Sequence, residues 1–243
     1  VLAGDYDLSS IKACISGSAT LPMRVKQEFE ALTNGHLVEG YGLSEAPTAT
    51  HCNPILGENR EGSIGLPLPN VQCKVVDLET GTEEVAVGKP GELIIKGPQV
   101  MAGYHQHPYE TAIVLRDGWL YTGDVVRMDE QGYFYIIDRK KDVIKAGGFQ
   151  VWPNEIEAVI MQHPAVREVA VAGVVDENDA EVVIAWVVLH EGETSTKEEI
   201  REFCDTYLTR YKIPKYVDFR ESLPRTIVGK VLRRVLVAEH QLS

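Results

Sequence analysis

The sequence is short of the features that mark several specialised classes of protein. Basic residues are outnumbered, with 24 Lys and Arg against 36 Asp and Glu, so the net charge is -12. A nucleic-acid-binding protein needs a basic face to meet phosphates. The composition therefore argues against that class, although a local site for one nucleotide stays open. No apolar run approaches the roughly 18 residues that cross a membrane, which leaves only peripheral membrane contact open.

Cysteines are also scarce, and they lack the C-x-x-C spacing of common metal and redox sites. The four are Cys14, Cys52, Cys73 and Cys204. Zinc and disulfide interpretations are therefore weak, and a reducing cytoplasm is the default expectation. The first residue is Val1, inside what reads as a folded segment. We therefore expect the chain to be the C-terminal part of a longer protein. The oligomeric state is left open.

What the sequence does have is the composition of a soluble globular protein, with 44% hydrophobic and 25% charged residues. We divide it into three zones. The first, residues 1–67, is predicted to be the C-terminal part of a large α/β domain. Residues 11–15 read as a short buried strand, a helix runs from Pro22 to Gly35, and residues 36–42 form the next strand. The apolar face of this helix consists of Val25, Phe29 and Leu32.

The second zone, residues 68–138, is predicted to be a β-rich subdomain. Short apolar runs alternate with turn signals such as Glu79-Thr80-Gly81. A small sheet or open barrel fits this pattern. The expected strands cover residues 71–77, 91–97, 120–129 and 132–138.

The third zone, residues 139–243, is predicted to be a small α+β domain. It contains a helix at residues 153–163, a second helix that begins with a capping box of Thr196 and Glu199, and a last helix after Gly229. Two apolar strands cover residues 167–175 and 181–189. The charge cluster at residues 138–142 suits an exposed hinge between the zones. The expected fold class is therefore α/β plus α+β.

The stretch EGYGLSE places an aromatic ring between two glycines, followed by a hydroxyl and a carboxylate. Tyr41 could stack on a purine, while Gly40 and Gly42 would let the backbone approach it closely. Glu45 could hold Mg²⁺, which prefers oxygen ligands, and Ser44 could touch a phosphate. The structural alternative is a strand followed by a Gly-rich turn, with a buried tyrosine.

Two further clusters contain groups that suit a nucleotide. Asp124 lies in a strand-rich region, where its carboxylate could accept hydrogen bonds from two ribose hydroxyls; a turn aspartate is the alternative. In the stretch DRKKDVIKAGGFQ, several cations precede a pair of glycines. Cations suit phosphates and glycines suit a ligand that passes close to the backbone, whereas a solvated charged face is the usual alternative.

The fourth cluster is PRTIVGKVLRR, in which Lys230 follows Gly229. An ammonium group that enters a site could neutralise negative charge on phosphorus in a transition state. The alternative is an ordinary basic surface helix. Each cluster is weak alone, and their order and spacing favour a common function.

Read in order, these stretches resemble the adenylate-forming enzymes, the superfamily of acyl-CoA synthetases, luciferases and peptide-synthetase adenylation domains. The matching stretches are SGSATLP, EGYGLSE, GELIIKGPQVMAGY, YTGDV, DRKKDVIKAGGFQVWPNEIE and PRTIVGK. They span nearly the whole chain. Within the superfamily the sequence is most similar to bacterial long-chain and medium-chain fatty-acid–CoA ligases.

This resemblance implies roles for residues of the first two zones. The residues that would surround the adenine and the acyl group are Gly17, Ser18, Ala19, Gly40, Tyr41 and Gly42. Ser44 would contact the phosphates of ATP, and Glu45 would bind Mg²⁺. Asp124 would hold both ribose hydroxyls, with help from Arg139.

The resemblance also implies a moving third zone. Lys141 would be the hinge about which the C-terminal domain swings. Lys230 would bridge the substrate carboxylate and the α-phosphate during adenylation. After the swing Lys145 would take its place, and Gly147 and Gly148 would flank the pantetheine arm of CoA. The implied reaction converts a fatty acid, ATP and CoA into acyl-CoA, AMP and pyrophosphate through an acyl-adenylate.

The sequence departs from the family at one important point. The Ser/Thr/Gly-rich phosphate loop with its lysine is not found within these 243 residues. The chain alone could therefore be an inactive nucleotide-binding piece, and the acyl chain length stays open. Smaller departures are Ser44, where many relatives have Thr, and Val228, where Ser, Thr or Asn is common. A further alternative is an adenylating enzyme that loads the thiol of a carrier protein instead of CoA.

Overall fold

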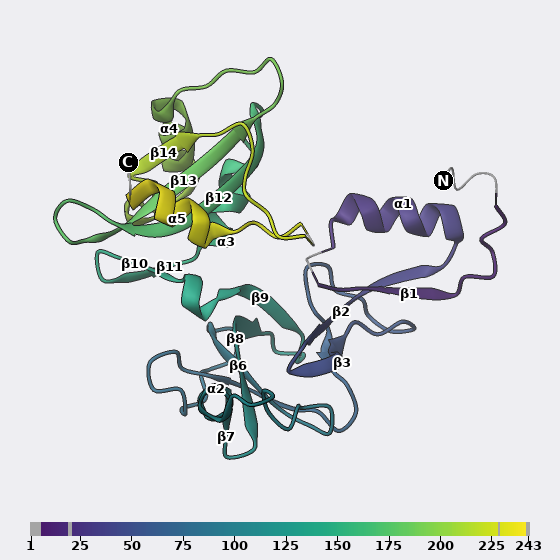
Figure 1. Ribbon diagram of the computed structural model, residues 1–243. Coiled ribbons are helices and arrows are strands. Elements are labelled where there is room, and N and C mark those ends of the chain that lie inside the picture. Colours follow the sequence, from purple (N-terminus) through teal and green to yellow (C-terminus); the bar gives the residue numbers. More distant parts are fainter. Residues whose placement is uncertain (1–5, 19–20, 228, 242–243) are drawn as a thin grey trace. The chain divides into compact units, whose positions relative to one another are not determined.

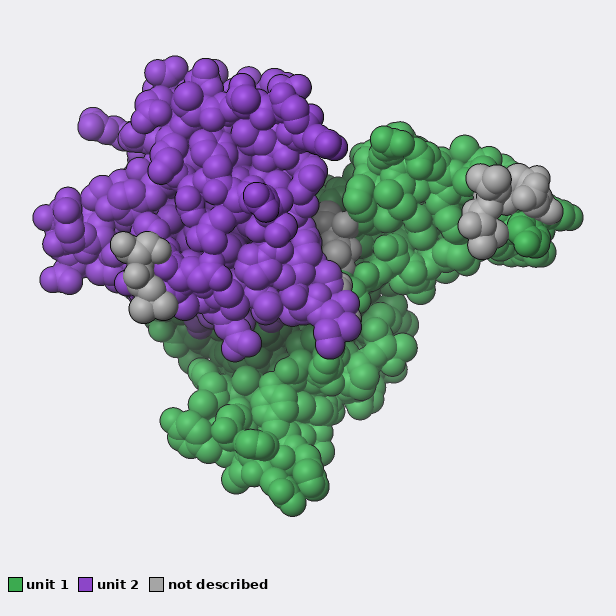
Figure 2. Space-filling view, turned by 45° about the horizontal axis from the view of Figure 1, so that its top comes forward, with its two compact units in different colours: residues 1–136 green, residues 137–243 purple. Residues whose placement is uncertain are grey.

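The computed structural model describes residues 6–18, 21–227 and 229–241. The chain divides into two compact units, residues 1–136 and 137–243 (Figure 2). Within the described residues, no helix is long and apolar enough to cross a membrane. The architecture is mixed α/β (Figure 1). The division of the chain at residues 67 and 138 stays a prediction.

The first sheet of unit 1 has four strands in the order β1-β2-β3-β4. Their bounds are β1 Ala13–Ser16, β2 His36–Leu43, β3 Ala46–Cys52 and β4 Leu66–Pro67. Strands β1 and β2 are parallel and are connected by helix α1, Met23–Thr33, whereas the other pairs are antiparallel. The carboxyl ends of β1 and β2 therefore meet at one edge of the sheet, where α/β proteins usually bind ligands.

Helix α1 ends one residue earlier than predicted. Asn34, not Gly35, adopts the left-handed conformation at the C-cap, with φ 53°, and its backbone N–H donates to the carbonyl of Glu30. Asn tolerates this conformation because its short polar side chain can bond locally. The predicted buried strand is also wrong in part, because it begins at Ala13 and Ile15 is 61% exposed. Val25 and Leu32 on the apolar face of α1 are exposed as well.

The second sheet of unit 1 has the order β5-β6-β8-β7, with β9 pairing β8. Its strands are β5 Gln72–Val76, β6 Gly91–Lys96, β7 Leu115–Arg116, β8 Trp119–Met128 and β9 Phe134–Arg139. The four predicted strands are all present, while β7 and the short helix α2, Pro108–Val114, were not predicted. The core beneath this sheet consists of Ile64, Val75, Leu93, Ile95, Val126 and Phe134.

Unit 2 is built on a three-stranded sheet with helices on both faces. Its strands are β12 Val166–Val175, β13 Glu181–Leu189 and β14 Tyr216–Phe219, and its helices are α3 Pro153–Ile160, α4 Lys197–Tyr207 and α5 Arg233–Gln241. One face of β13 packs with Ile156 and Ile200 from α3 and α4. The other face packs Trp186 with Leu236 from α5. Because both faces are buried, β12 and β13 are apolar at nearly every position.

Two local predictions for unit 2 have different outcomes. The capping box is confirmed, because the backbone N–H of Glu199 donates to Thr196 Oγ1 at 3.1 Å and the reciprocal bond is 2.8 Å. The charge cluster at residues 138–142 is only partly exposed. Asp138 is 2% exposed and accepts the N–H groups of Arg139 and Asn154. Burial raises the pKa of Asp138. Because Asp138 is buried and accepts the N–H of Asn154 in the first turn of α3, it caps that helix and is not part of an exposed hinge.

Candidate functional site

The carboxyl ends of β1 and β2 leave a narrow strip of bare backbone. Ser16 pairs with Glu39 in parallel register, so Gly17 and Gly40 follow side by side. A Cβ added to Gly17 would lie 3.1 Å from the carbonyl oxygen of Gly40, and a Cβ on Gly40 would lie 2.9 Å from Ile15 Cγ2. Both positions therefore favour glycine, and the strip gives a flat ligand close access to the backbone.

The neighbouring residues extend this strip. Ser18 follows Gly17 with φ 74°, in the left-handed region, while Ala19 lies outside the described residues. A Cβ on Gly42 would lie 2.5 Å from the carbonyl oxygen of Thr48. The β2–β3 register shifts between Tyr41 and Leu43, so Gly42 lies at an irregularity where two backbones approach closely.

Tyr41 and Asp124 meet although they lie 83 residues apart in the sequence. The Tyr41 hydroxyl donates to Asp124 Oδ2 at 2.5 Å. Asp124 lies in β8 and is 4% exposed. This bond joins a residue of the first sheet to a carboxylate of the second sheet within unit 1. Tyr41 and Asp124 were both predicted as site residues, and the structure brings their side chains into direct contact.

A bulge in β8 orients Asp124. The β6–β8 register shifts between Glu92 and Ile94, so residues 122–124 lie opposite a single residue of β6. Gly123 has φ 70°, and its N–H donates to Glu92 Oε1 at 3.1 Å. The N–H of Asp124 donates to Thr122 Oγ1. Bulges of this kind redirect a side chain next to a site, and here the redirected group is a carboxylate.

A buried histidine supports Tyr41 from behind. The rings of Tyr41 and His51 have centroids 5.8 Å apart, and His51 packs edge-on against Phe134. Its Nδ1 lies 3.0 Å from Thr50 Oγ1, and its Nε2 lies 3.3 Å from Cys73 Sγ. Burial lowers the pKa of His51 to about 3, so the ring is neutral at physiological pH. His51 orients Tyr41 as an uncharged packing partner.

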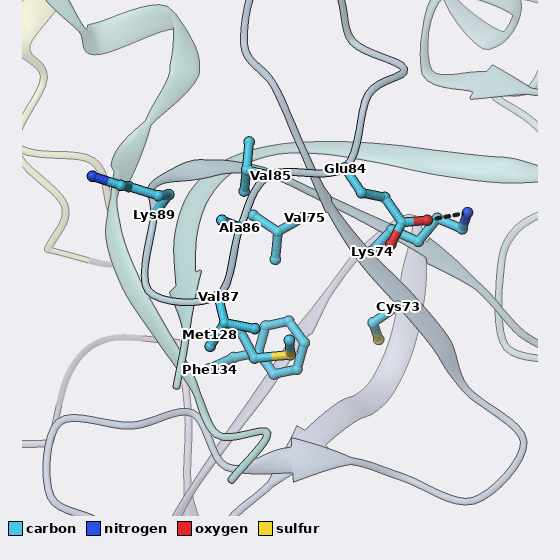
Figure 3. Close-up of a pocket in the computed structure, with 10 residues that line it drawn as sticks. All are labelled: Cys73, Lys74, Val75, Glu84, Val85, Ala86, Val87, Lys89, Met128 and Phe134. Carbon is cyan, nitrogen blue, oxygen red and sulfur yellow. Dashed lines mark hydrogen bonds and ion pairs between the residues drawn. The ribbon is translucent and has the colours of Figure 1, made fainter. Parts of the chain in front are cut away.

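A small pocket lies in unit 1 beside Cys73 and Phe134 (Figure 3). Cys73 and Phe134, which both contact His51, belong to its wall, and an ion pair of Lys74 with Glu84 lies beside it. Its volume is about 70 Å³, whereas ligand pockets usually measure several hundred Å³. The pocket is therefore too small for a nucleotide.

Ser44 and Glu45 form a two-residue turn between β2 and β3, where a loop was predicted. Ser44 is exposed. Glu45 Oε1 accepts the hydroxyl of Tyr104 at 2.6 Å, and the backbone carbonyl of Glu45 accepts the N–H of Met101 at 2.8 Å. The bond to Glu45 raises the pKa of Tyr104 to about 12. The loop at residues 101–104 thus fixes both the backbone and the carboxylate of Glu45.

The surroundings of Glu45 fit Mg²⁺ better than a transition metal. No group of three or more His, Cys, Asp or Glu side chains that could hold a metal ion is present among the described residues. Mg²⁺ is commonly bound through one or two carboxylates together with phosphates and water. A single carboxylate beside a hydroxyl is therefore a suitable protein contribution for magnesium.

In unit 2, Lys145 lies on the hairpin of β10, Ile144–Ala146, and β11, Phe149–Val151. Gly147 and Gly148 form its turn with φ 58° and 84°, and a Cβ on either would meet no atom within 4 Å. The glycines are needed for backbone conformation, since two consecutive positive φ values are typical of this turn type. Lys145 is exposed, and its backbone N–H donates to Glu181 Oε2.

A pocket of about 430 Å³ lies beside this hairpin. It is mostly apolar, and its charged lining residues are Arg210, Lys215 and Glu181. Tyr211 lines it and stacks on Phe149, with ring centroids 4.4 Å apart and planes 16° from parallel. Its volume is in the range of ligand pockets. Gly147 is among its lining residues, so the pocket continues the surface of the hairpin turn.

Lys230 lies in the segment between β14 and α5, away in sequence from the β10–β11 hairpin that carries Lys145. It is exposed, and its backbone N–H donates to Thr226 Oγ1 at 3.1 Å. The two other predicted residues of unit 2 lie at its start. Arg139 is the last residue of β9 and Lys141 lies in a single 3₁₀ turn, Lys140–Asp142. Both are exposed.

The sequence matches two models of one enzyme family. Residues 2–105 match the AMP-binding enzymes, and residues 155–230 match the C-terminal domain of AMP-binding enzymes. The chain belongs to the AMP-binding enzyme family. The two matched regions contain the strip at Gly17 and Gly40, Tyr41, and the Lys230 segment.

Relatives in this family include CoA ligases. The chain is 55% identical to a long-chain-fatty-acid–CoA ligase of Bacillus subtilis (strain 168) over 96% of its own length and 42% of the relative's. It is 37% identical to 4-coumarate–CoA ligase 1 of Solanum tuberosum, over 98% of this chain and 44% of that protein. The chain thus spans about two fifths of the length of the curated relatives it matches.

Solved structures of the AMP-binding enzymes share the fold. ATP-bound MatB from Rhodopseudomonas palustris matches with a TM-score of 0.85 and 38% identity, over 93% of this chain and 45% of that one. O-succinylbenzoate coenzyme A synthetase from Bacillus subtilis, in complex with ATP and magnesium ion, matches with a TM-score of 0.79 and 28% identity, over 96% and 48% of the two chains.

Sequence reasoning missed several supporting residues of the candidate site. Tyr104 ends the motif stretch GELIIKGPQVMAGY, so its place in the motif was a usable signal. His51 gave none, because a lone histidine in a short strand is indistinguishable from an ordinary core residue. Thr122 and Glu92, which shape the bulge at Asp124, also lie in motif stretches, but their role could not be found without the strand pairing.

Proposed function

We propose that this chain carries the nucleotide and thiol-accepting surfaces of an ATP-dependent acyl-CoA ligase. The reaction would join a carboxylic acid, of which a long-chain fatty acid is the favoured class, to CoA at the expense of ATP, giving acyl-CoA, AMP and pyrophosphate. The observation that carries the proposal is the bond from Tyr41 to Asp124, at the carboxyl end of two parallel strands. An aromatic face and an oriented carboxylate suit the base and the ribose of one adenosine.

The first surface is the adenosine site of unit 1. Gly17, Ser18 and Ala19 would line the adenine together with the backbone at Gly40 and Gly42, and the ring of Tyr41 would stack on it. Asp124 would accept both ribose hydroxyls. The bond from Tyr41 holds the carboxylate in one orientation before the ligand arrives, which lowers the cost of ordering on binding.

The turn at Ser44 and Glu45 would hold the phosphates. The Ser44 hydroxyl would donate to a phosphate oxygen, and the Glu45 carboxylate would be the protein ligand of Mg²⁺. When bound, the ion would neutralise charge on the phosphates. The Tyr104 hydroxyl and the Met101 N–H keep the carboxylate and the backbone of Glu45 in place.

The second surface is presented by the two lysines of unit 2. In the first step, a carboxylate oxygen of the acid attacks the α-phosphorus and the bond to pyrophosphate breaks, while Lys230 neutralises the charge that gathers there. In the second step, the thiolate of CoA attacks the acyl carbon and the bond to AMP breaks. Lys145 lies on the β10–β11 hairpin and Lys230 on the separate segment between β14 and α5, and a swing about Lys141 would present them in turn.

CoA is the favoured acceptor because of the surface beside Lys145. Gly147 and Gly148 lie at an open turn that a pantetheine arm could pass. The pocket next to them offers Arg210, and a cation suits the phosphates of a nucleotide, while Lys215 is already paired with Asp176 at 2.6 Å. A comparison of CoA with a phosphopantetheinyl carrier protein as acceptor would separate this proposal from a carrier-loading enzyme, which should prefer the protein.

Fatty acid is the favoured substrate because the relative from Bacillus subtilis, at 55% identity, is named for long-chain fatty acids. The direct experiment is ATP–pyrophosphate exchange with acids from acetate to palmitate, run on this chain and on the full-length reading frame that contains it. Exchange that rises with chain length supports the proposal. Absence of exchange with every acid in both proteins would contradict adenylation of these substrates.

A second candidate function is nucleotide binding without turnover. It is favoured by the lack of a Ser/Thr/Gly-rich phosphate loop with a lysine in these 243 residues. Under this alternative the chain binds AMP but supports no pyrophosphate exchange. Turnover of ATP by the 243-residue chain itself would remove it.

A further inference from the structure

The peptide bond that directly precedes Lys230 is held at both ends by side chains. The carbonyl oxygen of Gly229 accepts a hydrogen bond from Arg225 Nη1 at 2.7 Å. The N–H of Lys230 donates to Thr226 Oγ1 at 3.1 Å. Because a peptide unit is planar and rigid, fixing its oxygen and its hydrogen fixes the orientation of the whole unit, and with it the direction in which the chain leaves Gly229.

The same segment is closed by its own backbone. The N–H of Thr226 donates to the carbonyl of Lys230 at 2.8 Å, and the N–H of Gly229 donates to the carbonyl of Thr226 at 2.9 Å. Arg225 and Val231 form an isolated antiparallel bridge at the base. Gly229 has φ 82°, a conformation that favours glycine. Lys230 is therefore presented from a segment in which the described residues Arg225, Thr226, Gly229 and Lys230 are bonded to one another.

Arg225 also ties this loop to the sheet. Its Nη2 donates to Glu168 Oε2 at 2.5 Å, and Glu168 lies on β12. Both side chains are partly exposed, at 43% and 29%, so the ion pair by itself contributes little stability. Its value is geometric, because the planar guanidinium bonds a carboxylate of the sheet and the carbonyl before Lys230 at the same time.

We propose that Arg225 and Thr226 are positioning residues for Lys230, which set the direction of its ammonium group in the adenylation step. The inference rests on the proposed function, in which Lys230 meets the α-phosphate. Small displacements of a reacting group can cost up to about a hundredfold in rate. The two residues act through the peptide that carries Lys230 and have no role in the thiol step.

The kinetic test uses the full-length reading frame with Thr226→Ala, Thr226→Ser and Arg225→Ala. ATP–pyrophosphate exchange reports adenylation, and thioester formation from added acyl-adenylate reports the second step. We expect kcat for exchange to fall about tenfold in Thr226→Ala and Arg225→Ala, with KM for ATP and the thioester rate within about twofold. Thr226→Ser keeps the hydroxyl and should restore exchange. Equal losses in both steps would show a merely structural role and overturn the proposal.

Two control variants remove similar side chains elsewhere in unit 2. Thr206 on α4 donates its hydroxyl to the carbonyl of Glu202 in the same way that a helix hydroxyl commonly does, and Arg201 is exposed on the same helix. Thr206→Ala and Arg201→Ala should leave both steps within about twofold of the wild type. A tenfold loss of exchange in either control would show that the assay reports general damage, which would contradict the assignment to Arg225 and Thr226.

A second measurement separates this inference from the proposed function. Hydrogen exchange of the Lys230 amide, followed by NMR in the 243-residue chain, should be about fivefold to tenfold faster in Thr226→Ala than in Thr226→Ser, because one hydrogen bond of about 1 kcal/mol is lost. If the amide exchanges faster in Thr226→Ala but Lys230→Ala does not reduce pyrophosphate exchange, the proposed role of Lys230 is wrong, while the hydrogen bond that holds its peptide is confirmed. If the amide exchanges at the same rate in both variants, Thr226 does not hold the peptide of Lys230 and this inference is overturned.

Discussion

The chemically useful groups of the two units are held in opposite ways. In unit 1, Asp124 is buried and its carboxylate is bonded to Tyr41 from a different sheet. In unit 2, Lys145 and Lys230 are exposed, and the bonds that hold them run through their backbone amides. A fixed, preorganised surface suits a ligand part that stays in one place through a reaction. Exposed lysines whose backbone amides are hydrogen-bonded suit side chains that must enter a site and leave it again.

The largest expected effect comes from removing the charge of the preorganised carboxylate in unit 1. Asp124→Asn removes the charge that would accept the ribose hydroxyls, and hydrogen bonds to charged groups are worth about 1.5–3 kcal/mol. We expect AMP affinity, measured by titration calorimetry on the full-length reading frame, to fall about thirtyfold. Asp117→Asn, at an exposed turn of unit 1 with φ 51°, is the matched control. Equal affinity in the wild type and in Asp124→Asn would remove Asp124 from the site.

The next effect concerns the packing behind Tyr41 and follows from the pKa of about 3 for His51. In the unfolded chain a histidine has a pKa near 6.5, so below that pH the unfolded state binds one more proton than the folded state. The free energy of unfolding should therefore decrease as the pH falls from 6.5 towards 3, by about 2 kcal/mol between pH 7 and pH 5.

Urea unfolding of the 243-residue chain at pH 7 and pH 5 measures this change. His51→Gln should remove most of the pH dependence, whereas His190→Gln, at an exposed position of unit 2, should preserve it. An unchanged pH dependence in His51→Gln would show that the ring is not held neutral in the folded protein.

A smaller effect tests how Glu45 is held. Tyr104→Phe removes the hydroxyl that donates to Glu45 Oε1, and the loss of one such bond is worth about 1 kcal/mol. We expect the Mg²⁺ concentration needed for half-maximal ATP binding to rise about fivefold, with little change in AMP binding without the ion. Tyr109→Phe, exposed on α2, is the control. A loss of AMP binding equal to that of ATP would indicate general damage to unit 1.

The smallest expected effect concerns the stability of helix α4 in unit 2. Thr196→Ala removes the capping box of α4 and should lower the free energy of unfolding by about 1 kcal/mol, as measured by urea denaturation. Thr196→Ser keeps the cap and should keep the stability. Because α4 carries no group of either step, the rates of both steps should stay unchanged in the full-length reading frame. A selective loss of one step would mean that the cap influences the lysines.

Local sequence patterns were sufficient for much of the fold. Strands β5, β6, β8 and β9 of the second sheet, the apolar strands β12 and β13 and the capping box of Thr196 all follow from alternation, burial and short-range bonding. Helix α2 escaped prediction because its seven residues, PYETAIV, are too few to show a period. The exposure of Ile15 and Leu32 escaped it because an apolar pattern shows which face can be buried and not whether another segment covers it.

The site was predictable only as separate pieces. Motif order identified Tyr41 and Asp124, but their contact depends on two sheets that meet 83 residues apart in sequence and on a bulge in β8. No short-range pattern encodes such a bulge. Arg225 was part of a motif stretch, yet its bonds to Gly229 and Glu168 became visible only with the loop and β12 in place.

The most direct test of this account separates the two steps in two lysine variants. Lys230→Ala and Lys145→Ala are compared in ATP–pyrophosphate exchange and in thioester formation from added acyl-adenylate, in the full-length reading frame. The account predicts a crossed result: Lys230→Ala loses exchange by about a hundredfold or more and keeps the thiol step, while Lys145→Ala keeps exchange and loses the thiol step. If each variant loses both steps equally, the two lysines do not serve alternate steps, and the proposed division of labour is wrong.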